Sequence, residues 1–584
     1  MMQPHEDHDA RTPRTGTSAR PERRSGAGSL TRVGDIRVLR VKGSSYDMGY
    51  QHGALLAEEI ARGPIPYYRT YIEQIVKKGT RLGPAAALVF PVIRQTLGRR
   101  VGHAMPEFAL DTIRGLADGA GLAYADLMDG CVMPDSLLWI AARAMTMSGR
   151  GPAVAHRLSL GLGCTSAVAW GDATRDGMLL HARNFDYHGV GIWPATKTVI
   201  FHEPDEGHAY VSVAAAGVTM GGITAMNDAG ITLTVHQHMF TDATRLGGTP
   251  IGVLGDVVMR EAESLDDAEA ILSAHRPIGC WTYLVTDGKS REVLCFEENP
   301  DRRVAHRSSL DDSTFGYANV YLDPELGATE QNLYGSFWRH NQGRHRRVHQ
   351  LLADSDGELD AQGMASILGD TGDTECRVHN SIAMVMTTGS VVFRPETGDV
   401  WVGTGDAPTS HGTFEPFNLH ERDHAPALGT LTVGSRADEG EREAFERYRR
   451  AYVAYLEDDD LPGGRVHAAE AVALAPEQPV YRFVAGFMDL VSGDAAAAAE
   501  AFTHAIDLGH PDPERVAGFH LFRGRARDML GDRPGALRDY RTALGHHADA
   551  PVHQAARAGL RRAFRASQAK RLQLDMSLGD VINP

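Results

Sequence analysis

The chain is predicted to be an α+β protein with a helical region at its C-terminal end. Short apolar runs rich in β-branched residues alternate with Gly, Asp and Asn between residues 164 and 240, which is typical of strands. Residues 251–275 change to helical spacing, and strand patterns return after residue 380. Runs of strands around a helical segment favour a layered α+β sandwich. At 584 residues the chain is long enough for several domains.

A disordered tail is predicted for residues 1–33. These residues are rich in Arg, Pro, Ser and Gly and include few apolar side chains, so they cannot bury a core of their own. They also lack the apolar run of a secretory signal. Because no run of 18 apolar residues occurs anywhere in the chain, no membrane span is expected.

A largely helical region is predicted for residues 34–163. Ile36–Val41 largely alternates apolar and charged residues, which indicates a first strand. Met48–Ala61 has the spacing of a helix, and so has the segment Leu110–Ala117. The many small residues of 147–161 predict a loop at the end of this region.

The core is predicted to span residues 164–420. Residues 251–275 and Arg344–Leu352 are expected to be helical. The predicted strands are Cys164–Trp170, Met178–Arg183, Lys197–His202, Ala209–Ala215, Gly230–His236, Cys280–Asp287, Glu292–Glu297, Ser381–Met386, Ser390–Arg394 and Asp399–Gly403. The polar, Gly-rich residues 421–442 are predicted to be a linker.

A helical domain is predicted for residues 443–570. Two similar motifs lie 34 residues apart, Ala471-Val472-Ala473-Leu474 and Ala505-Ile506-Asp507-Leu508. This distance is the repeat length of tetratricopeptide (TPR) helix pairs. TPR-like repeats would offer a surface for a protein partner. A plain helical bundle is the alternative interpretation of the same pattern.

Charge and cysteine content exclude several classes of protein. The net charge of −16, with no dense basic patch, argues against a nucleic-acid partner. The chain contains five cysteines, Cys131, Cys164, Cys280, Cys295 and Cys376. Their odd number and the lack of a C-x-x-C pair favour reduced thiols and a cytoplasmic protein. His236 and His238 have no third ligand placed by spacing, so neither a metal nor an organic cofactor is expected.

The strongest chemical signal is the segment Gly163-Cys164-Thr165-Ser166. It opens an apolar strand, and the next strand ends in Arg183-Asn184-Phe185-Asp186, which returns a cation and a carboxylate toward the thiol. A nearby guanidinium would lower the pKa of the thiol. Cleavage of the Gly163–Cys164 bond would also free an α-amine, whose ordinary pKa of about 7.7–8.0 suits a general base. A lone strand cysteine would more simply be a core residue, but the surrounding motifs favour a nucleophile.

In this order, the motifs resemble those of the N-terminal-nucleophile (Ntn) hydrolases, and among them the penicillin acyltransferase-like and choloylglycine hydrolase-like proteins. The resemblance covers residues 35–420. Besides the two motifs above, it rests on Gly43–Gly53, Met226–Ile231, Tyr317-Ala318-Asn319 and Asp399–Val402. Penicillin acyltransferases have Gln where this chain has Arg183, which matches the choloylglycine hydrolase side.

The resemblance implies a four-layer αββα sandwich that cleaves its own chain. The thiol of Cys164 would attack the carbonyl of Gly163, an N-to-S acyl shift, and water would complete the cleavage. Residues 34–163 would then be a pro-region, or small chain, that stays bound to the core.

The resemblance also implies roles for particular side chains. Asp186 would position the new amine, Arg183 would contact the thiol or the substrate, and the side-chain amide of Asn319 would stabilise the oxyanion. Further candidates for the oxyanion or substrate site are Gln237, Asn227 and Arg344, with Arg347 beside the last. The residues alone leave other interpretations open: a surface ion pair for Arg183 and Asp186, and turn positions for Asn319 and Asn227.

The sequence therefore predicts an enzyme without a cofactor that acts on the C–N bond of an amide. The substrate would be a small-molecule amide, an acyl donor or an acylated amino acid, attacked through a thioester on Cys164. Hydrolysis and acyl transfer are both open, and a peptidase of short peptides would share the mechanism. A different class is also open: a TPR-containing interaction protein whose Ntn domain is inactive.

Overall fold

A computed structural model describes most of the chain. The described residues are 22–68, 70, 104–148, 163–219, 221–238, 241, 243–309, 311–330, 335–355, 357–372, 381–433, 439–574 and 576. Three features of the sequence lie outside them: the tail before residue 22, most of the predicted loop at 147–161, and Cys376.

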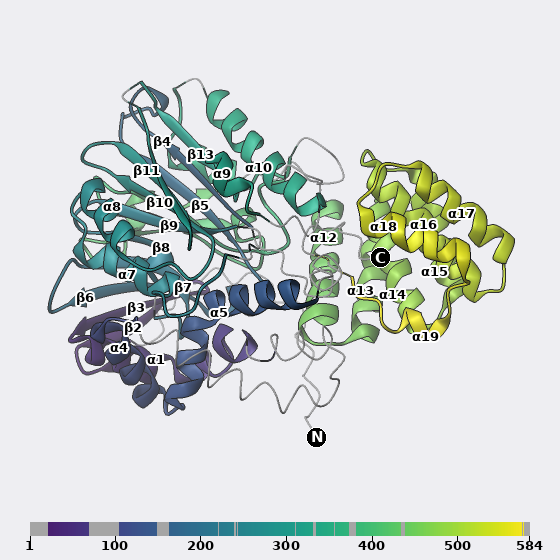
Figure 1. Ribbon diagram of the computed structural model, residues 1–584. Coiled ribbons are helices and arrows are strands. Elements are labelled where there is room, and N and C mark those ends of the chain that lie inside the picture. The colour runs from purple at the N-terminus through teal and green to yellow at the C-terminus, as the bar shows by residue number, and fades with distance from the viewer. Residues whose placement is uncertain are drawn as a thin grey trace.

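Two large sheets form the centre of the molecule (Figure 1). In the described residues, sheet A has the order β1 (Arg23–Ser25), β2 (Gly28–Val33), β3 (Ile36–Gly43), β6 (Lys197–Pro204), β7 (Tyr210–Ala215), β8 (Thr224–Asn227), β9 (Ile231–Gln237), β10 (Trp281–Asp287), β11 (Glu292–Asn299) and β12 (Arg302–Arg307). Neighbours in it are antiparallel except β3 and β6, which are parallel because the N-terminal helices cross over between them.

Sheet B carries the cysteine strand. Its order is β13 (Thr314–Tyr317), β4 (Gly163–Ala169), β5 (Leu180–Asp186), β14 (Thr387–Arg394), β15 (Asp399–Gly403), β16 (Thr413–Asn418) and β17 (Asp423–His424), and β18 (Leu431–Thr432) also pairs with β16. The pairs are antiparallel, and Cys164 lies opposite Phe185 in the β4–β5 register.

The two sheets pack face to face through an apolar core. Phe201 of sheet A and Val391 of sheet B belong to one buried cluster. Successive side chains of β4 point to opposite faces of sheet B, because side chains alternate along a strand. Val168 packs toward β10 and β11 of sheet A, whereas Ala167 and Ala169 pack toward the helices on the outside.

Helices cover the outer face of each sheet. Sheet A is covered by α1 (Ser45–Ile60), α4 (Glu107–Ala120), α7 (Ile251–Glu261) and α8 (Leu265–Ala274). Sheet B is covered by α10 (Gly335–Ala353) and α11 (Ala361–Leu368). The remaining helical elements of this part are α5 (Tyr124–Ser148), α9 (Pro324–Gly327) and the short turns η2 (Gly171–Ala173), η3 (Pro194–Thr196), η4 (Gly221–Ile223), η5 (Thr409–His411) and η6 (Pro426–Leu428). The predicted four-layer αββα sandwich is confirmed.

The C-terminal helical region follows the sandwich in the chain and packs against it (Figure 1). It comprises α12 (Glu439–Tyr452), the π-helical turn η7 (Val453–Glu457), α13 (Leu461–Leu474), α14 (Pro479–Ser492), α15 (Ala495–Leu508), α16 (Pro513–Met529), α17 (Arg533–Gly545), α18 (Ala550–Arg561) and α19 (Ala566–Ala569). Asp side chains cap α13, α15 and α17 at their N-termini. The helical character is confirmed, and the division into TPR-like repeats stays a prediction.

Parts of the predicted tail and linker are ordered strands. Residues 23–33 were assigned to a disordered tail, which is wrong: β2 pairs with β3, and Leu30 is buried against α1. Residues 421–442 contain β17, η6 and β18, so part of the predicted linker pairs with sheet B. Short polar strands of this kind show little alternation of apolar and polar residues. Whether they form depends on pairing with a neighbouring strand.

Several other boundaries also differ from prediction. The predicted strand Ser381–Met386 is wrong, since this segment is irregular and β14 begins at Thr387. The predicted helix over 251–275 is two helices, because Ser264 caps a new one. Strands β8, β12 and β13 were not predicted. The other predicted strands are confirmed to within a few residues. No described helix has both the length and the apolar character that crossing a membrane needs.

Glycines bring α1 and α4 into backbone contact. A Cβ on Gly49 would lie 2.1 Å from the carbonyl oxygen of Thr112, and one on Gly115 would lie 2.0 Å from that of Tyr46. His52 also belongs to α1, and its Nε2 accepts a hydrogen bond from the backbone N–H of Gly217 at 2.9 Å. Burial lowers the pKa of His52 to about 4, so it stays a neutral acceptor. Residues of the motif Gly43–Gly53 are thus needed for the packing of α1.

We expect Gly115→Ala to destabilise the N-terminal helices by about 1–3 kcal/mol, because the methyl group would overlap the backbone of α1. Urea unfolding, followed by circular dichroism, measures this change. Gly545→Ala is the control, since its added Cβ meets nothing within 4 Å. Equal stability of the two variants would contradict the close helix contact.

Candidate active site

Cys164 lines a pocket between several parts of the chain. The pocket holds about 850 Å³ of space between atoms, its open mouth included. Three parts of the chain build it: the N-terminal helical region, the β4–β5 pair and sheet A. Its lining includes Ile65, Tyr68, Cys131, Pro134, Phe185, Tyr187, Trp193, Val218, Ile223, Val235, Ile251 and Trp281. Such a lining favours an apolar ligand group.

A guanidinium lies directly beside the thiol. Nη2 of Arg183 is 3.3 Å from Sγ of Cys164, and it also donates to the carbonyl oxygen of Val235 at 2.6 Å. Nη1 donates to the carbonyl oxygen of Ile223 and to Thr224. These contacts fix the cation under the pocket. Arg183 therefore reaches the thiol from within β5, as predicted, and is not a surface residue.

The pKa of the Cys164 thiol reflects opposing influences. Burial raises it above the ordinary value and is the largest influence, whereas the charge of Arg183 lowers it. The Asp186 carboxylate raises it further, and the Asp186 backbone N–H lowers it. In the uncleaved chain the thiol is thus protonated, and a base has to remove its proton before it can attack.

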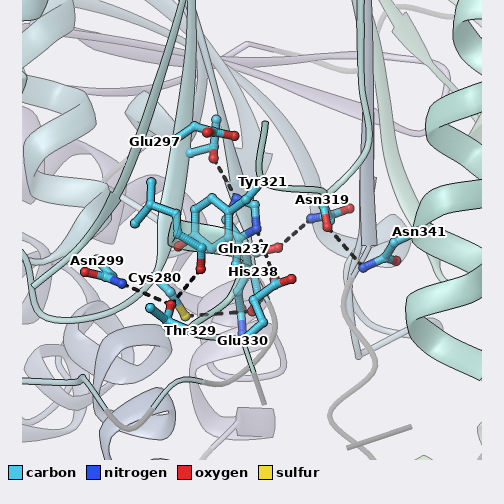
Figure 2. A network of polar contacts seen from close by, with 12 residues as sticks. Gln237, His238, Cys280, Glu297, Asn299, Asn319, Tyr321, Thr329, Glu330 and Asn341 are labelled. Atoms are coloured by element: carbon cyan, nitrogen blue, oxygen red, sulfur yellow. Dashed lines mark hydrogen bonds and ion pairs between the residues drawn. The ribbon is translucent and has the colours of Figure 1, made fainter. Parts of the chain in front are cut away.

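Asn319 and Arg344 hold the two backbone polar groups of Cys164. The Cys164 N–H donates to Oδ1 of Asn319 at 2.7 Å, and Nη1 of Arg344 donates to the Cys164 carbonyl oxygen at 2.8 Å. Nη2 of Arg344 donates to the same Oδ1 at 3.0 Å. The Nδ2 group of Asn319 donates to the carbonyl oxygen of Gln237 at 2.7 Å (Figure 2). In this uncleaved arrangement Asn319 accepts from Cys164, and its own donor is used elsewhere.

Little space surrounds the α-carbon of Gly163. A Cβ there would lie 2.8 Å from Cε of Met384 and 3.2 Å from both Nη2 of Arg344 and Oδ2 of Asp186. Any side chain would displace one of these three groups. The same geometry shows that a cation and a carboxylate flank the predicted cleavage site.

Asp186 has one satisfied and one unsatisfied oxygen. Oδ1 accepts the hydroxyl of Thr387 at 2.6 Å, whereas no described residue donates a hydrogen bond to the buried Oδ2. Burial raises the pKa of Asp186 to about 6, and the charges of Arg344 and Arg183 oppose this rise. A buried carboxylate oxygen without a donor is costly, so this site is built to receive one.

A second polar network holds the segment that carries Asn319. Glu297, buried on β11, accepts the N–H groups of Leu322 and Asp323 at 2.7 and 2.8 Å. The His238 ring stacks on Tyr321, with ring centres 3.4 Å apart (Figure 2). These contacts support Asn319, whose backbone φ of 51° lies in the left-handed region. Asn is among the few non-glycine residues that tolerate it.

The structure brings most of the predicted site residues together. Cys164, Arg183 and Asp186 line one pocket with Gln237. Arg344 contacts Cys164 and Asn319 directly, so this candidate lies at the centre of the site.

Asn227 does not belong to the site. Its Nδ2 donates to the carbonyl oxygens of Met259 and Ala262, and its Oδ1 accepts the N–H of Ile231. It therefore ties the end of α7 to the β8–β9 turn, and its prediction as a substrate residue is wrong. Arg347 forms a two-bond ion pair with Asp370 instead of contacting Cys164.

Some residues of the site were missed from the sequence. The Thr387 hydroxyl donates a hydrogen bond to Asp186, and the side-chain oxygen of Asn341 accepts one from Arg344 at 2.8 Å. Tyr68, from the N-terminal region, lines the pocket. None of them belongs to a motif that could have marked it. The sequence placed no third metal ligand beside His236 and His238. The described residues contain no group of three or more His, Cys, Asp and Glu side chains that could hold a metal ion.

Asp186→Asn should change the pH dependence of stability in a Cys164→Ala background, which lacks the thiol. The folded-state pKa of about 6 lies above the ordinary 3.8, so the folded chain binds this proton more tightly. The stability that Asp186 contributes is present below pH 3.8 and is lost as the pH rises through about 6. We expect the asparagine variant to lose that decline, measured as Tm against pH. Parallel curves with and without Asp186 would contradict the raised pKa.

Comparison with known proteins agrees with this geometry. Residues 173–407 match the family model described as acyl-coenzyme A:6-aminopenicillanic acid acyl-transferase. An uncharacterised protein of Archaeoglobus fulgidus is 28% identical over 355 residues, which are 56% of this chain and 56% of that protein. Protein dcd1B of Dictyostelium discoideum is 24% identical over 194 residues, which are 31% of this chain and 34% of that protein. The chain thus spans about half, or less, of these two relatives.

Among solved structures, the N-acylethanolamine-hydrolyzing acid amidase ortholog of Caenorhabditis elegans is similar at 14% identity and a TM-score of 0.29. The similarity covers 40% of this chain and 93% of that one. Arg183, Asp186, Asn319 and Arg344 all lie inside the segment that matches the family model, and Cys164 precedes it. Residues 173–407 are thus similar in sequence to the acyl-coenzyme A:6-aminopenicillanic acid acyl-transferase family.

Proposed function

We propose that this chain is a self-cleaving cysteine Ntn enzyme that hydrolyses or transfers the acyl group of an amide. The similarity of its central segment to that family supports an acyl-transfer reaction in general. The observation that carries the finer proposal is the position of Cys164. Its thiol lines an apolar pocket, 3.3 Å from the Arg183 guanidinium, and its own N–H is held by Asn319.

Self-cleavage at Gly163–Cys164 would supply the missing base. Sγ attacks the Gly163 carbonyl carbon, the C–N bond breaks, and the thiol proton passes to the leaving nitrogen, which becomes the new amine. Water then hydrolyses the thioester, releasing the Gly163 carboxylate and the free thiol. The new amine would emerge beside Oδ2 of Asp186, which is 3.2 Å from the Cβ position of residue 163 and receives no hydrogen bond from the described residues of the uncleaved chain.

Catalysis would reuse the same atoms. The Cys164 amine takes the thiol proton while Sγ attacks the carbonyl carbon of the substrate, and then gives a proton to the leaving amine. The acyl group remains as a thioester until water or a second amine accepts it. Arg183 would stabilise the thiolate form of the nucleophile, because it lies directly beside the sulfur. Asp186 would orient the amine.

The pocket supports an apolar acyl group as the bound part of the substrate. Arg183 and Asp186 are the only charged residues that line it in the described part of the chain. The walls are aromatic and aliphatic. An apolar chain gains free energy by leaving water, whereas the polar ends of a free peptide would lose hydrogen bonds there.

The two alternatives from the sequence have less support. A peptidase would need partners for several peptide N–H and carbonyl groups, whereas this lining is mostly aromatic and aliphatic, with Thr219 and Gln237 as polar side chains beside Arg183 and Asp186. An inactive scaffold would have no need to hold Cys164, Arg183 and Asp186 around one pocket, yet the three line it together. Both would be favoured only if the cleavage and acyl-chain experiments below fail.

The first prediction concerns self-cleavage. Purified wild-type chain should separate into residues 1–163 and 164–584, the second beginning Cys-Thr-Ser, because the proposed attack of the Cys164 thiol breaks the Gly163–Cys164 bond. Cys164→Ala should stay intact. Intact mass spectrometry with N-terminal sequencing measures both.

A second pocket thiol provides a matched control. Cys131 also lines the pocket, but burial raises its pKa to about 12 and it lies outside the strand that carries the cleavage site. Cys131→Ala should therefore be cleaved like the wild type. Wild-type chain that stays intact after prolonged incubation would remove the amine base from the mechanism.

The second prediction concerns acyl-chain length. Turnover of a series of N-acyl amides should rise with chain length, by about fourfold in kcat/KM for each methylene that the pocket buries, because each contributes about 0.8 kcal/mol. Steady-state kinetics on acetyl to dodecanoyl amides of one amine measures this. Equal values for short and long chains would show that the apolar walls do not bind the acyl group.

A further inference from the structure

The C-terminal helical region contacts one wall of the pocket through a carboxylate. Glu457, the last residue of η7, accepts the backbone N–H of Val190 on Oε1 and that of Gly191 on Oε2, the latter at 3.0 Å. Both of its oxygens are therefore used by the loop of residues 187–193, here called the aromatic loop. Such π-helical turns recur at functional sites.

The aromatic loop directly follows Asp186 and carries two pocket walls. Tyr187 and Trp193 both line the pocket above Cys164. The loop turns sharply at Gly189, whose φ of 91° is in the region that favours glycine and whose carbonyl accepts the N–H of Trp193. Because the turn is short, a displacement of the Val190 and Gly191 backbone moves the wall residues on both sides of it.

The other side of the aromatic loop is held by the N-terminal region. The hydroxyl of Tyr68 donates to the carbonyl oxygen of His188 at 3.1 Å and accepts Nε1 of Trp193 at 2.7 Å. The rings of Tyr68, Tyr187 and Trp193 also meet edge to face. The aromatic loop thus lies between two regions that are remote in sequence. Tyr68 binds it from the N-terminal region, and Glu457 binds it from the C-terminal helical region.

Buried apolar side chains also connect the C-terminal helical region to the segment beside the predicted cleavage site. Val190, Met384 and Met386 are buried in one cluster with the helical residues Tyr452 and Phe487. The carbonyl of Met386 accepts the N–H of Tyr187 at 2.9 Å. The helical region therefore supports both segments that flank Asp186.

The fit between loop and carboxylate is close. A Cβ on Gly191 would lie 3.2 Å from Oε2 of Glu457, tighter than an ordinary contact. Burial raises the pKa of Glu457 to about 7, while the loop N–H groups lower it. Asp458 also raises it, and the nearby Arg449 is a cation paired with Glu446 and Asp406.

We propose that Glu457 is a positioning residue through which the C-terminal helical region shapes the acyl pocket. By anchoring the N–H groups of Val190 and Gly191, it holds Tyr187 and Trp193 against the acyl chain. The helical region is then a working part of the enzyme and not merely an appended module. This inference rests on the proposed function, since it requires that the pocket bind the acyl group.

Glu457→Gln tests the anchor with little change in shape. A glutamine side chain offers one oxygen and one NH₂ group, so only one of the two loop N–H groups keeps an acceptor. In the full-length protein, hydrogen–deuterium exchange of the peptide spanning residues 187–193 should become faster by about tenfold or more. Gly191→Ala perturbs the same contact from the loop side and should have the same effect.

Asp539→Asn is the matched control. Asp539 is a buried acid of the same helical region that pairs with His520, Arg523 and Arg527 inside it. Its loss weakens the region without removing an acceptor from the aromatic loop. Exchange in residues 187–193 should stay near the wild-type rate. Equal acceleration in Asp539→Asn and Glu457→Gln would overturn the proposal, because general loosening would then explain both.

Kinetics separate pocket shape from chemistry. Glu457→Gln should raise the KM for a dodecanoyl amide by about tenfold while leaving the kcat and KM for an acetyl amide near wild type, since a long chain would bury far more surface against the pocket walls than a short one. Faster exchange with unchanged KM for both substrates would overturn the role in the pocket. A wild-type protein that turns over no amide would refute the proposed function, whereas exchange unchanged by Glu457→Gln would refute this inference independently.

Discussion

The buried guanidinium of Arg344 is the interaction on which the rest of the site depends. It is fully enclosed and donates to the Cys164 carbonyl, the Thr165 hydroxyl, Asn319 and Asn341. An enclosed cation is costly unless its donors are used, and here they fix the start of β4. Burial lowers the pKa of Arg344, and the charges of Asp186 and Cys164 oppose that change. The cation and the site therefore stabilise each other.

The uncleaved site is arranged around an incomplete set of polar contacts. No described residue donates to one oxygen of Asp186, and Asn319 occupies a left-handed backbone conformation that Glu297 and its neighbours maintain. Buried groups of this kind reduce stability and persist at sites where function requires them. A new amine at Cys164 would meet both groups, so the product of cleavage would be better satisfied than the precursor.

The pocket is a joint product of three regions of the chain. Tyr68 comes from the N-terminal helices, the thiol and its cation come from sheet B, and Glu457 fixes the aromatic loop from the C-terminal helices. Removing either flanking region would leave the β4–β5 pair in place and open a pocket wall. The N-terminal fragment would thus have to stay bound after cleavage for the acyl site to exist.

Local sequence determined the strands around Cys164, the alternation of β4, the proximity of Arg183 and Asp186 to the thiol, and the helical nature of the C-terminal region. These features depend on neighbours within one or two strands, where pattern and spacing carry the information. The tertiary structure alone decided that Asn227 is a clamp, that residues 23–33 are strands, and that Thr387, Tyr68 and Glu457 reach the site. The partners of Thr387, Tyr68 and Glu457 lie more than 100 residues away in the chain. No local pattern specifies which groups such side chains will meet once the sheets have packed.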